Sequence, residues 1–276
     1  MAASLSTANA ANTANAAPLE YLLHFADNAL VLGQRNAQWC GHGPVLEEDI
    51  AMANISLDLI GQSRMLYQHA AVLQGDGMTE DRLAYFRDAS QYRNYTLVEL
   101  PHHGPLAGTA ASASDRDYAT TIVRNFLYSS LMLLVWEALQ QSSDPQLAAI
   151  AGKAVKETRY HVRHSLDWLI KFGDGTDESH ARAQTALDHL LPYTQEFWTP
   201  CAFEAQAIAQ GAGPSMQSLH AQWDACIDAA LAQATLQRPS AGGHVTRGKE
   251  GLHSEHLSYL LGEMQGLARQ HPEAVW

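Results

Sequence analysis

Long stretches of helical periodicity, separated by short breaks, limit what this chain can fold into more than any other feature. Apolar residues recur three and four positions apart through most of its 276 residues, and the alternating pattern of strands is nearly absent. Gly, Pro and Asp residues interrupt the stretches and mark where helices end. The sequence therefore predicts an all-α fold.

The first half of the chain predicts two helical hairpins. Four long helices are expected at about residues 18–39, 45–73, 115–140 and 144–172. The turn CGHGP joins the first two, and Ser143-Asp144-Pro145 caps the start of the fourth. Between the hairpins, a shorter helix at about 79–97 leads into the loop ELPHHGPLAGTAASAS, whose Pro and Gly residues prevent a continuous helix. Two hairpins joined by a long crossover are typical of a ferritin-like four-helix bundle.

The second half predicts further helices at about 177–199, with a break near Pro192, and at 201–210, 214–235 and 252–270. We expect them to pack on the bundle, because neither an internal repeat nor a change in composition marks a second domain. Residues 1–17 are rich in Ala, Ser and Asn and lack Lys and Arg, which predicts a disordered tail rather than a targeting signal. A single ferritin-like helical domain, a bundle with additional C-terminal helices, is thus expected over residues 18–276.

Composition argues against several classes of protein. The chain has 17 basic and 29 acidic side chains, and its net charge of -12 disfavours binding to nucleic acid or to an anionic membrane. Its most apolar run, LMLLVW at 131–136, is far shorter than the roughly 20 residues that span a bilayer. Cys40, Cys201 and Cys226 are widely spaced and odd in number, as expected of reduced thiols. We therefore predict a cytoplasmic protein without nucleic-acid or membrane partners.

A ferritin-like bundle raises the question of a di-iron site. Such a site takes one carboxylate from each of two helices and a Glu-x-x-His pair from each of the other two, because residues three apart share one helix face. Glu-x-x-His motifs begin at Glu99 and Glu250, but the first contains Pro101 and the second contains Gly251. Neither motif lies in the middle of a long helix, so neither is expected to ligate iron.

Three acids lie near the midpoints of the long helices, namely Asp27, Asp58 and Glu157. Gly61 and Tyr160 stand three positions after Asp58 and Glu157, where histidines would be needed, and the third helix has no central carboxylate. We interpret the three acids as vestigial positions and predict no metal, catalytic or cofactor-binding residue. Asp27 and Asp58 are instead expected to make hydrogen bonds between helices.

The stretch ETRYHVRHSLDW, residues 157–168, looks at first like a metal-binding helix face. Glu157 and His161 are four residues apart, and His164 and Asp167 are three apart. At these spacings the side chains of one helix meet, so each pair is expected to form its own hydrogen bond without an ion.

Three longer strings resemble the C-subunit family of the bacterial phenylacetyl-CoA 1,2-epoxidase. They are LVLGQRNAQWCGHGPVLEEDIAMANISLDLIGQSR at 30–64, DPQLAAIAGKAVKETRYHVRHSLDWLIKFGDGT at 144–176 and GLHSEHLSYLLGEMQGLAR at 251–269, and the likeness runs in order from Pro18 to Trp276. The resemblance implies a structural, non-catalytic ferritin-like subunit that pairs with a homologous, catalytic subunit. It also implies a further small subunit, together with a reductase, as members of the complex.

The resemblance further implies what the whole complex does. It converts phenylacetyl-CoA into its ring epoxide with oxygen and NADPH, as part of aerobic phenylacetate degradation. The di-iron site would belong to the catalytic subunit, and the flavin and iron-sulfur centre to the reductase. By this resemblance the present chain carries no cofactor of its own.

Two other functions stay open on the sequence. One is a metal-dependent, di-iron carboxylate oxidase that uses Glu157, His161 and acids such as Asp58. The other is a coenzyme A-thioester binding subunit, in which Arg247 and Lys249 contact phosphates although the chain as a whole is acidic.

Overall fold

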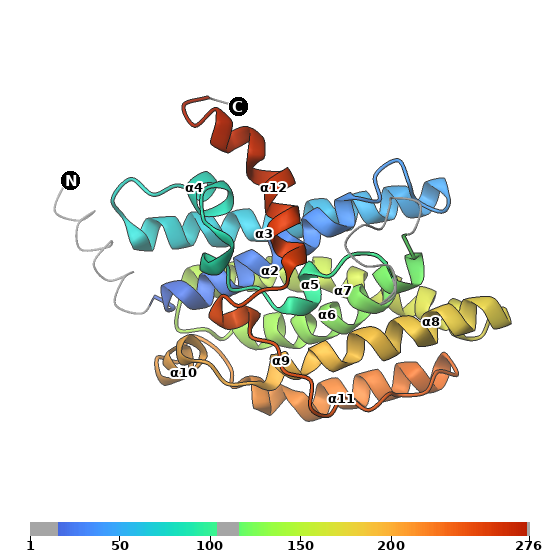
Figure 1. The fold of residues 1–276 in the computed structure, drawn as a ribbon. Coiled ribbons are helices and arrows are strands. Elements are labelled where there is room, and N and C mark those ends of the chain that lie inside the picture. The colour runs from blue at the N-terminus through green and yellow to red at the C-terminus, as the bar shows by residue number, and fades with distance from the viewer. Residues whose placement is uncertain (1–15, 104–115, 275–276) are drawn as a thin grey trace.

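Four long helices form the body of the protein (Figure 1). The structure, a computed structural model, describes residues 16–103 and 116–274. The long helices are α2 (Leu19–Ala37), α3 (Leu46–Gln74), α6 (Tyr118–Leu139) and α7 (Pro145–Gly173). α2 packs along α3, α6 packs along α7, and α3 meets α7 between the two hairpins. The all-α, ferritin-like prediction is confirmed, and the one β-type pairing in the described residues is an isolated bridge between Arg247 and Leu252.

The ends of the long helices follow from local chemistry. The side chain of Asp144 accepts hydrogen bonds from the backbone N–H groups of Gln146 and Leu147, which starts α7. Acidic residues fill the first turn of α3, where they complement the helix dipole, and Gly75 ends this helix with a φ of 71°. The predicted limits of all four helices agree with the structure to within a few residues.

The helix predicted at 79–97 is wrong. The chain forms α4 (Glu80–Tyr85), a 3-10 turn at Ala89–Gln91 and the short α5 (Thr96–Glu99). Asp88 and Gln91 form a capping box that starts the 3-10 turn, and the backbone N–H of Arg93 donates to the buried carboxylate of Asp27 at 2.8 Å instead of to a helical carbonyl. Most of the predicted crossover loop that follows lies at 104–115, outside the described residues.

The C-terminal helices pack around the bundle. α8 (Asp177–Leu190) is followed by a 3-10 turn (Leu191–Thr194) and α9 (Gln195–Trp198), so the predicted break near Pro192 is confirmed. Beyond them lie α10 (Ala202–Ala209), α11 (Met216–Gln233) and α12 (Glu255–Gln270). α8 and α11 pack against α6, whereas α12 packs on α4 and α2 and its C-terminal end projects from the body (Figure 1). That residues 18–276 form a single domain stays a prediction.

The predicted N-terminal tail lies mostly outside the described residues, which begin at residue 16. Ala17, which the prediction includes in the tail, is buried and its N–H donates to the Asp144 carboxylate at 2.8 Å. The same carboxylate caps α7, so the residue before Pro18 is fixed to the start of α7.

The core of the molecule is centred on α6. This helix is long and apolar enough to cross a membrane, yet 78% of its most apolar window is buried inside the fold, as in the core helix of a globular protein. The amide side chains of Asn36 on α2 and Asn125 on α6 exchange two hydrogen bonds, of 2.9 and 3.2 Å. These bonds join α2 of the first hairpin to α6 of the second in the interior of the bundle.

Candidate functional site

Two of the three predicted acids, Asp58 and Glu157, take part in side-chain contacts between α3 and α7. Asp58 Oδ2 lies 3.1 Å from His161 Nε2. One helical turn away, Gln62 donates from Nε2 to Glu157 Oε2 at 2.9 Å. The interhelical hydrogen bond predicted for Asp58 is confirmed, and the structure brings Asp58 and Glu157 onto one helix pair.

The pairings predicted within ETRYHVRHSLDW are wrong. His161 bonds to Asp58, and His164 Nε2 lies 2.8 Å from Glu48 Oε2. Tyr118 donates its hydroxyl to the same Glu48 carboxylate at 2.7 Å. Both histidines sit on the side of α7 that faces α3, so carboxylates of the neighbouring helix replace those of their own helix.

Asp27, the third acid, belongs to a different network. Its carboxylate is fully buried and accepts hydrogen bonds from the Tyr67 hydroxyl at 2.5 Å, from the Arg93 N–H at 2.8 Å and from two nitrogens of Arg87. Burial lowers the pKa of the Arg87 guanidinium, but the charge of Asp27, the hydrogen bond to it and the neighbouring Tyr67 and Tyr92 together outweigh burial and raise this pKa. Burial and the charge of Asp27 together raise the pKa of Tyr67. The pair is thus an arginine cation on a carboxylate, and the interhelical role predicted for Asp27 is confirmed.

These residues do not fit a di-iron centre. Arg87 supplies the positive charge next to Asp27 that a metal ion would otherwise supply, and the neutral amide of Gln62 stands opposite Glu157 where a carboxylate or imidazole would be required. No three His, Cys, Asp or Glu side chains in residues 16–103 and 116–274 gather closely enough to hold a metal ion. The absence of site residues stays a prediction.

The two Glu-x-x-His motifs have structural partners instead. Glu99 and His253, one from each motif, meet with 2.8 Å between Oε2 and Nδ1, and the Ser254 N–H donates to the same carboxylate at 2.6 Å. Burial lowers the pKa of His253, but the hydrogen bond and the charge of Glu99 outweigh burial and raise it. Glu99 therefore fixes the start of α12 to the segment before the crossover. Sequence spacing could not show this contact, because 154 residues separate its two members.

Lys249, predicted to contact coenzyme A phosphates in one alternative, is not free to do so. Its Nζ lies 2.9 Å from the Glu204 carboxylate and donates to the Thr199 carbonyl at 2.5 Å, and the Lys249 and Glu204 side chains are only 3% and 7% exposed. A buried ammonium requires such partners, since an unpaired charge is costly away from water. Only Arg247 of that predicted pair remains exposed.

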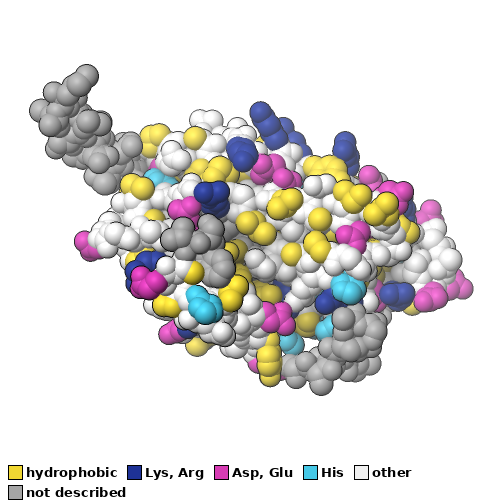
Figure 2. Space-filling model, turned by 90° about the horizontal axis from the view of Figure 1, so that it is seen from above, with side chains coloured by type: hydrophobic (Ala, Val, Ile, Leu, Met, Phe, Trp, Pro, Cys, Tyr) yellow, Lys and Arg dark blue, Asp and Glu magenta, His cyan; other side chains and the backbone are white. Residues whose placement is uncertain are grey.

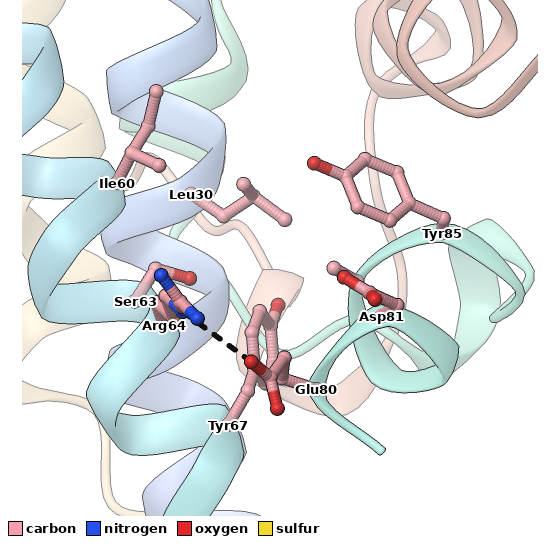
Figure 3. A pocket seen from close by; sticks show the side chains of 9 residues that line it. Leu30, Ile60, Ser63, Arg64, Tyr67, Glu80, Asp81 and Tyr85 are labelled. Carbon is pink, nitrogen blue, oxygen red and sulfur yellow. Dashed lines mark hydrogen bonds and ion pairs between the residues drawn. The ribbon is translucent and has the colours of Figure 1, made fainter. Parts of the chain in front are cut away.

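A pocket of about 290 Å³ opens between α2, α3 and α4 (Figure 3). Figure 3 shows side chains of α2 and α3 facing Tyr85 and Asp81 of α4 across it. Arg64 and Glu80 form an ion pair of 3.3 Å at its edge, and the buried Ser63 hydroxyl has no hydrogen-bond partner among the described residues. No pattern in the sequence indicates this pocket, because three separate segments line it with Leu30, Ile60, Ser63, Arg64, Tyr67, Glu80, Asp81, Ala84 and Tyr85.

Comparisons with known proteins point in the same direction as the three strings described above. The family described as "Phenylacetic acid catabolic protein" matches residues 1–276. The C subunit of the 1,2-phenylacetyl-CoA epoxidase of Escherichia coli (strain K12) is 41% identical over 256 residues. That alignment covers 93% of this chain and 98% of the relative.

Proposed function

The chain belongs to the phenylacetic acid catabolic protein family, and from this premise we propose that it is the structural, non-catalytic subunit of a phenylacetyl-CoA 1,2-epoxidase complex. Similarity to an epoxidase subunit supports a role in phenylacetate catabolism within a multi-subunit complex. In our proposal the chain pairs through a helix face with the homologous di-iron subunit that performs catalysis, the catalytic subunit. A further small subunit, together with the reductase, completes the complex in the cytoplasm.

One observation carries the non-catalytic part of the proposal. Where a di-iron bundle needs a converging set of carboxylates and histidines, this chain has Asp27 bound to Arg87 and Glu157 bound to Gln62. The contact between Asp58 and His161 supplies one carboxylate and one imidazole, which is too few ligands for two iron ions. The di-iron cofactor is therefore assigned to the catalytic subunit, and the flavin, the iron-sulfur centre and NADPH to the reductase.

A non-catalytic chain can still be required by the complex, because it can stabilise the catalytic subunit. Two related bundles can bury a large helix face against each other, which stabilises both chains and holds the catalytic one in shape. The long, straight α3 and α7 provide the rigid elements that such a face needs.

Co-expression with a homologue of the catalytic subunit, followed by sizing and iron assay of each chain, tests the proposal. We expect a stable complex whose iron stays with the catalytic subunit. The double variant Asp58→Asn, Glu157→Gln should leave the iron content and the epoxide yield of the complex unchanged. Near-stoichiometric iron in this chain purified alone, lost in Glu157→Gln, would contradict the proposal and establish the metal oxidase alternative.

The coenzyme A alternative has a separate test. Calorimetry of the isolated chain with phenylacetyl-CoA is expected to show no binding heat, because Lys249 is held by Glu204. Saturable binding that Arg247→Ala abolishes would instead support a thioester-binding subunit.

A further inference from the structure

Exposed hydrophobic side chains gather on one face of the molecule. Of the twelve large hydrophobic side chains that are exposed in the described residues, nine belong to α3, α4, α12 or the residues next to them: Val45, Leu46, Ile50, Leu57, Val72, Phe86, Leu252, Tyr259 and Leu267. The other three are Tyr160, Ile208 and Val245. Figure 2 views the molecule from above, the side on which α4 and α12 lie in Figure 1, and shows hydrophobic side chains spread across it. This distribution points to a surface that is covered in the assembled protein.

The outer face of α3, defined here by Leu46, Ile50, Leu57, Gly61 and Val72, is the longest part of this surface. Leu46, Leu57 and Val72 are 72%, 66% and 75% exposed. A surface helix normally carries charged residues opposite its buried side. From residue 50 to residue 63, about four turns, the one charged residue of α3 is Asp58, which bonds to His161 of α7. The exposed side chains of this part of α3 are Ile50, Asn54 and Leu57, so it lacks the charged side that a permanently solvated helix would have, whereas Arg64 and Gln68 are exposed beyond it.

The outer face of α3 forms a long strip within a larger surface. From Leu46 to Val72 this face is about 39 Å long at 1.5 Å per residue. At about 10 Å per helix the strip covers roughly 390 Å². α4 packs beside α3 and α12 packs beside α4, so the neighbouring helices enlarge the area toward the roughly 800 Å² that each partner contributes to a standard interface.

Charge decides between a different chain and a second copy of this one. Glu47 is exposed at the beginning of α3, and beside it the Glu48 and Asp49 carboxylates bond to His164 and to the Gly43 N–H. No Lys or Arg occurs in the sequence between Arg35 and Arg64. The first turn of α3 is thus an acidic rim without basic residues of its own, and two copies would each bring a net charge of -12. Like charges disfavour self-association, whereas a helix with basic residues opposite the first turn of α3 is complementary.

We infer that the outer face of α3 is the surface on which the catalytic subunit docks, through a long apolar helix with Lys or Arg residues where it meets the first turn of α3. This inference rests on the proposed function and assigns it a location. The pocket between α3 and α4 opens at the edge of this surface, next to Ile60 and Arg64. It takes one side chain of the docked helix, whose polar end reaches the unpartnered Ser63 hydroxyl.

A matched pair of variants tests the apolar part of the surface. Leu57→Glu places a charge in the middle of the outer face, and Ile208→Glu places one on α10, at an exposed apolar side chain outside the surface. Both positions are exposed, so both variants are expected to keep the circular dichroism spectrum and the melting temperature of the wild type. We expect Leu57→Glu to weaken binding to a homologue of the catalytic subunit tenfold or more, and Ile208→Glu to leave the affinity unchanged.

A second pair tests the charge. Glu47→Lys, at the acidic rim, is expected to slow association with the catalytic subunit, whereas Glu178→Lys on α8 is expected to leave the association rate unchanged.

The outcomes separate the inference from the proposed function. If wild type and Leu57→Glu bind the catalytic subunit equally well, the location is wrong and the scaffold role stands. If the wild-type chain forms no complex with the catalytic subunit, the proposed function itself fails. If Leu57→Glu instead abolishes a homodimer and leaves the complex with the catalytic subunit intact, the surface joins two copies of this chain and the inference is overturned.

Discussion

His24 and His102 are neutral imidazoles in the interior of the protein. Burial and, to a smaller extent, the charge of Lys249 lower the pKa of His24 to about 3, although the hydrogen bond to the Arg93 carbonyl opposes them. Burial and the charge of Arg124 lower the pKa of His102 well below the ordinary value. Each ring is held by fixed partners, so neither can take a proton without a loss of stability.

The fold should therefore become less stable in mild acid. The unfolded chain protonates His24 near pH 6.5 and the folded chain only near pH 3, so between these values each lower pH unit costs up to about 1.4 kcal/mol. His24→Gln is expected to remove this contribution and to flatten the decline between about pH 6 and pH 5. Urea unfolding at a series of pH values measures how the free energy of unfolding depends on pH. The exposed His42→Gln should keep the wild-type slope, and an equally steep slope in His24→Gln would contradict the assignment.

Single residues also show where the sequence stops being informative. The spacing of Asp27 and Asp58 within long helices was enough to predict interhelical hydrogen bonds, and the structure contains them. It could not identify Arg87 as the partner of Asp27, because 60 residues separate them. It also misassigned His164, since spacing within one helix reveals neighbours on that helix and not on the next one.

At the scale of elements, prediction succeeded where the signals were local. The Asp-Pro start of α7 and the Gly end of α3 are chemical features of the residues themselves, so they mark the helix limits reliably. The segment 79–97 is predicted as one helix, although Asp88 and Gln91 form a local capping box within it, and its contact with Asp27 at Arg93 is one that no local pattern contains. The pocket of Figure 3 escaped prediction for the same reason.

Two glycines of α7 provide a test of how this helix packs. A Cβ on Gly173, at the end of the helix, would lie 1.8 Å from the Ala234 carbonyl after α11, whereas a Cβ on Gly152 would meet nothing within 4 Å. Gly173→Ala is expected to lower the free energy of unfolding by about 2 kcal/mol, because the end of α11 must move. Gly152→Ala should raise it by about 0.5 kcal/mol, through helix propensity. Chemical denaturation measures both, and equal effects would show that α11 does not pack at Gly173.

At the scale of the whole molecule, the two hairpins are joined mainly through the meeting of α3 with α7 and through the amide pair of Asn36 and Asn125. α12 is fixed to the first hairpin and the segment that follows it, since Glu99 holds the residues before α12 and Arg35 of α2 donates to the His256 carbonyl at 3.0 Å. The N- and C-terminal parts of the chain therefore stabilise each other, although they are far apart in sequence.

Partner binding should appear in the stability of the whole chain. When the catalytic subunit is present at 100 times its dissociation constant, it is expected to stabilise this chain by about 2.7 kcal/mol, seen as a higher melting temperature. Raising the salt from about 0.1 M to about 1 M shortens the Debye length from about 10 Å to about 3 Å, so this gain should shrink. The chain alone is the control. A gain that is independent of salt would show that the acidic rim of α3 contributes nothing to docking.

The exposed outer face of α3 also affects degradation and aggregation of the chain in a cell before assembly. A newly made copy exposes an apolar strip that chaperones and proteases recognise, and at high concentration such strips adhere to one another. On the proposed pairing, copies made in excess of the catalytic subunit are left without a partner and are removed by quality control or lost to aggregates. The exposed apolar face of α3 thus makes it necessary for the cell to produce the two chains in balanced amounts.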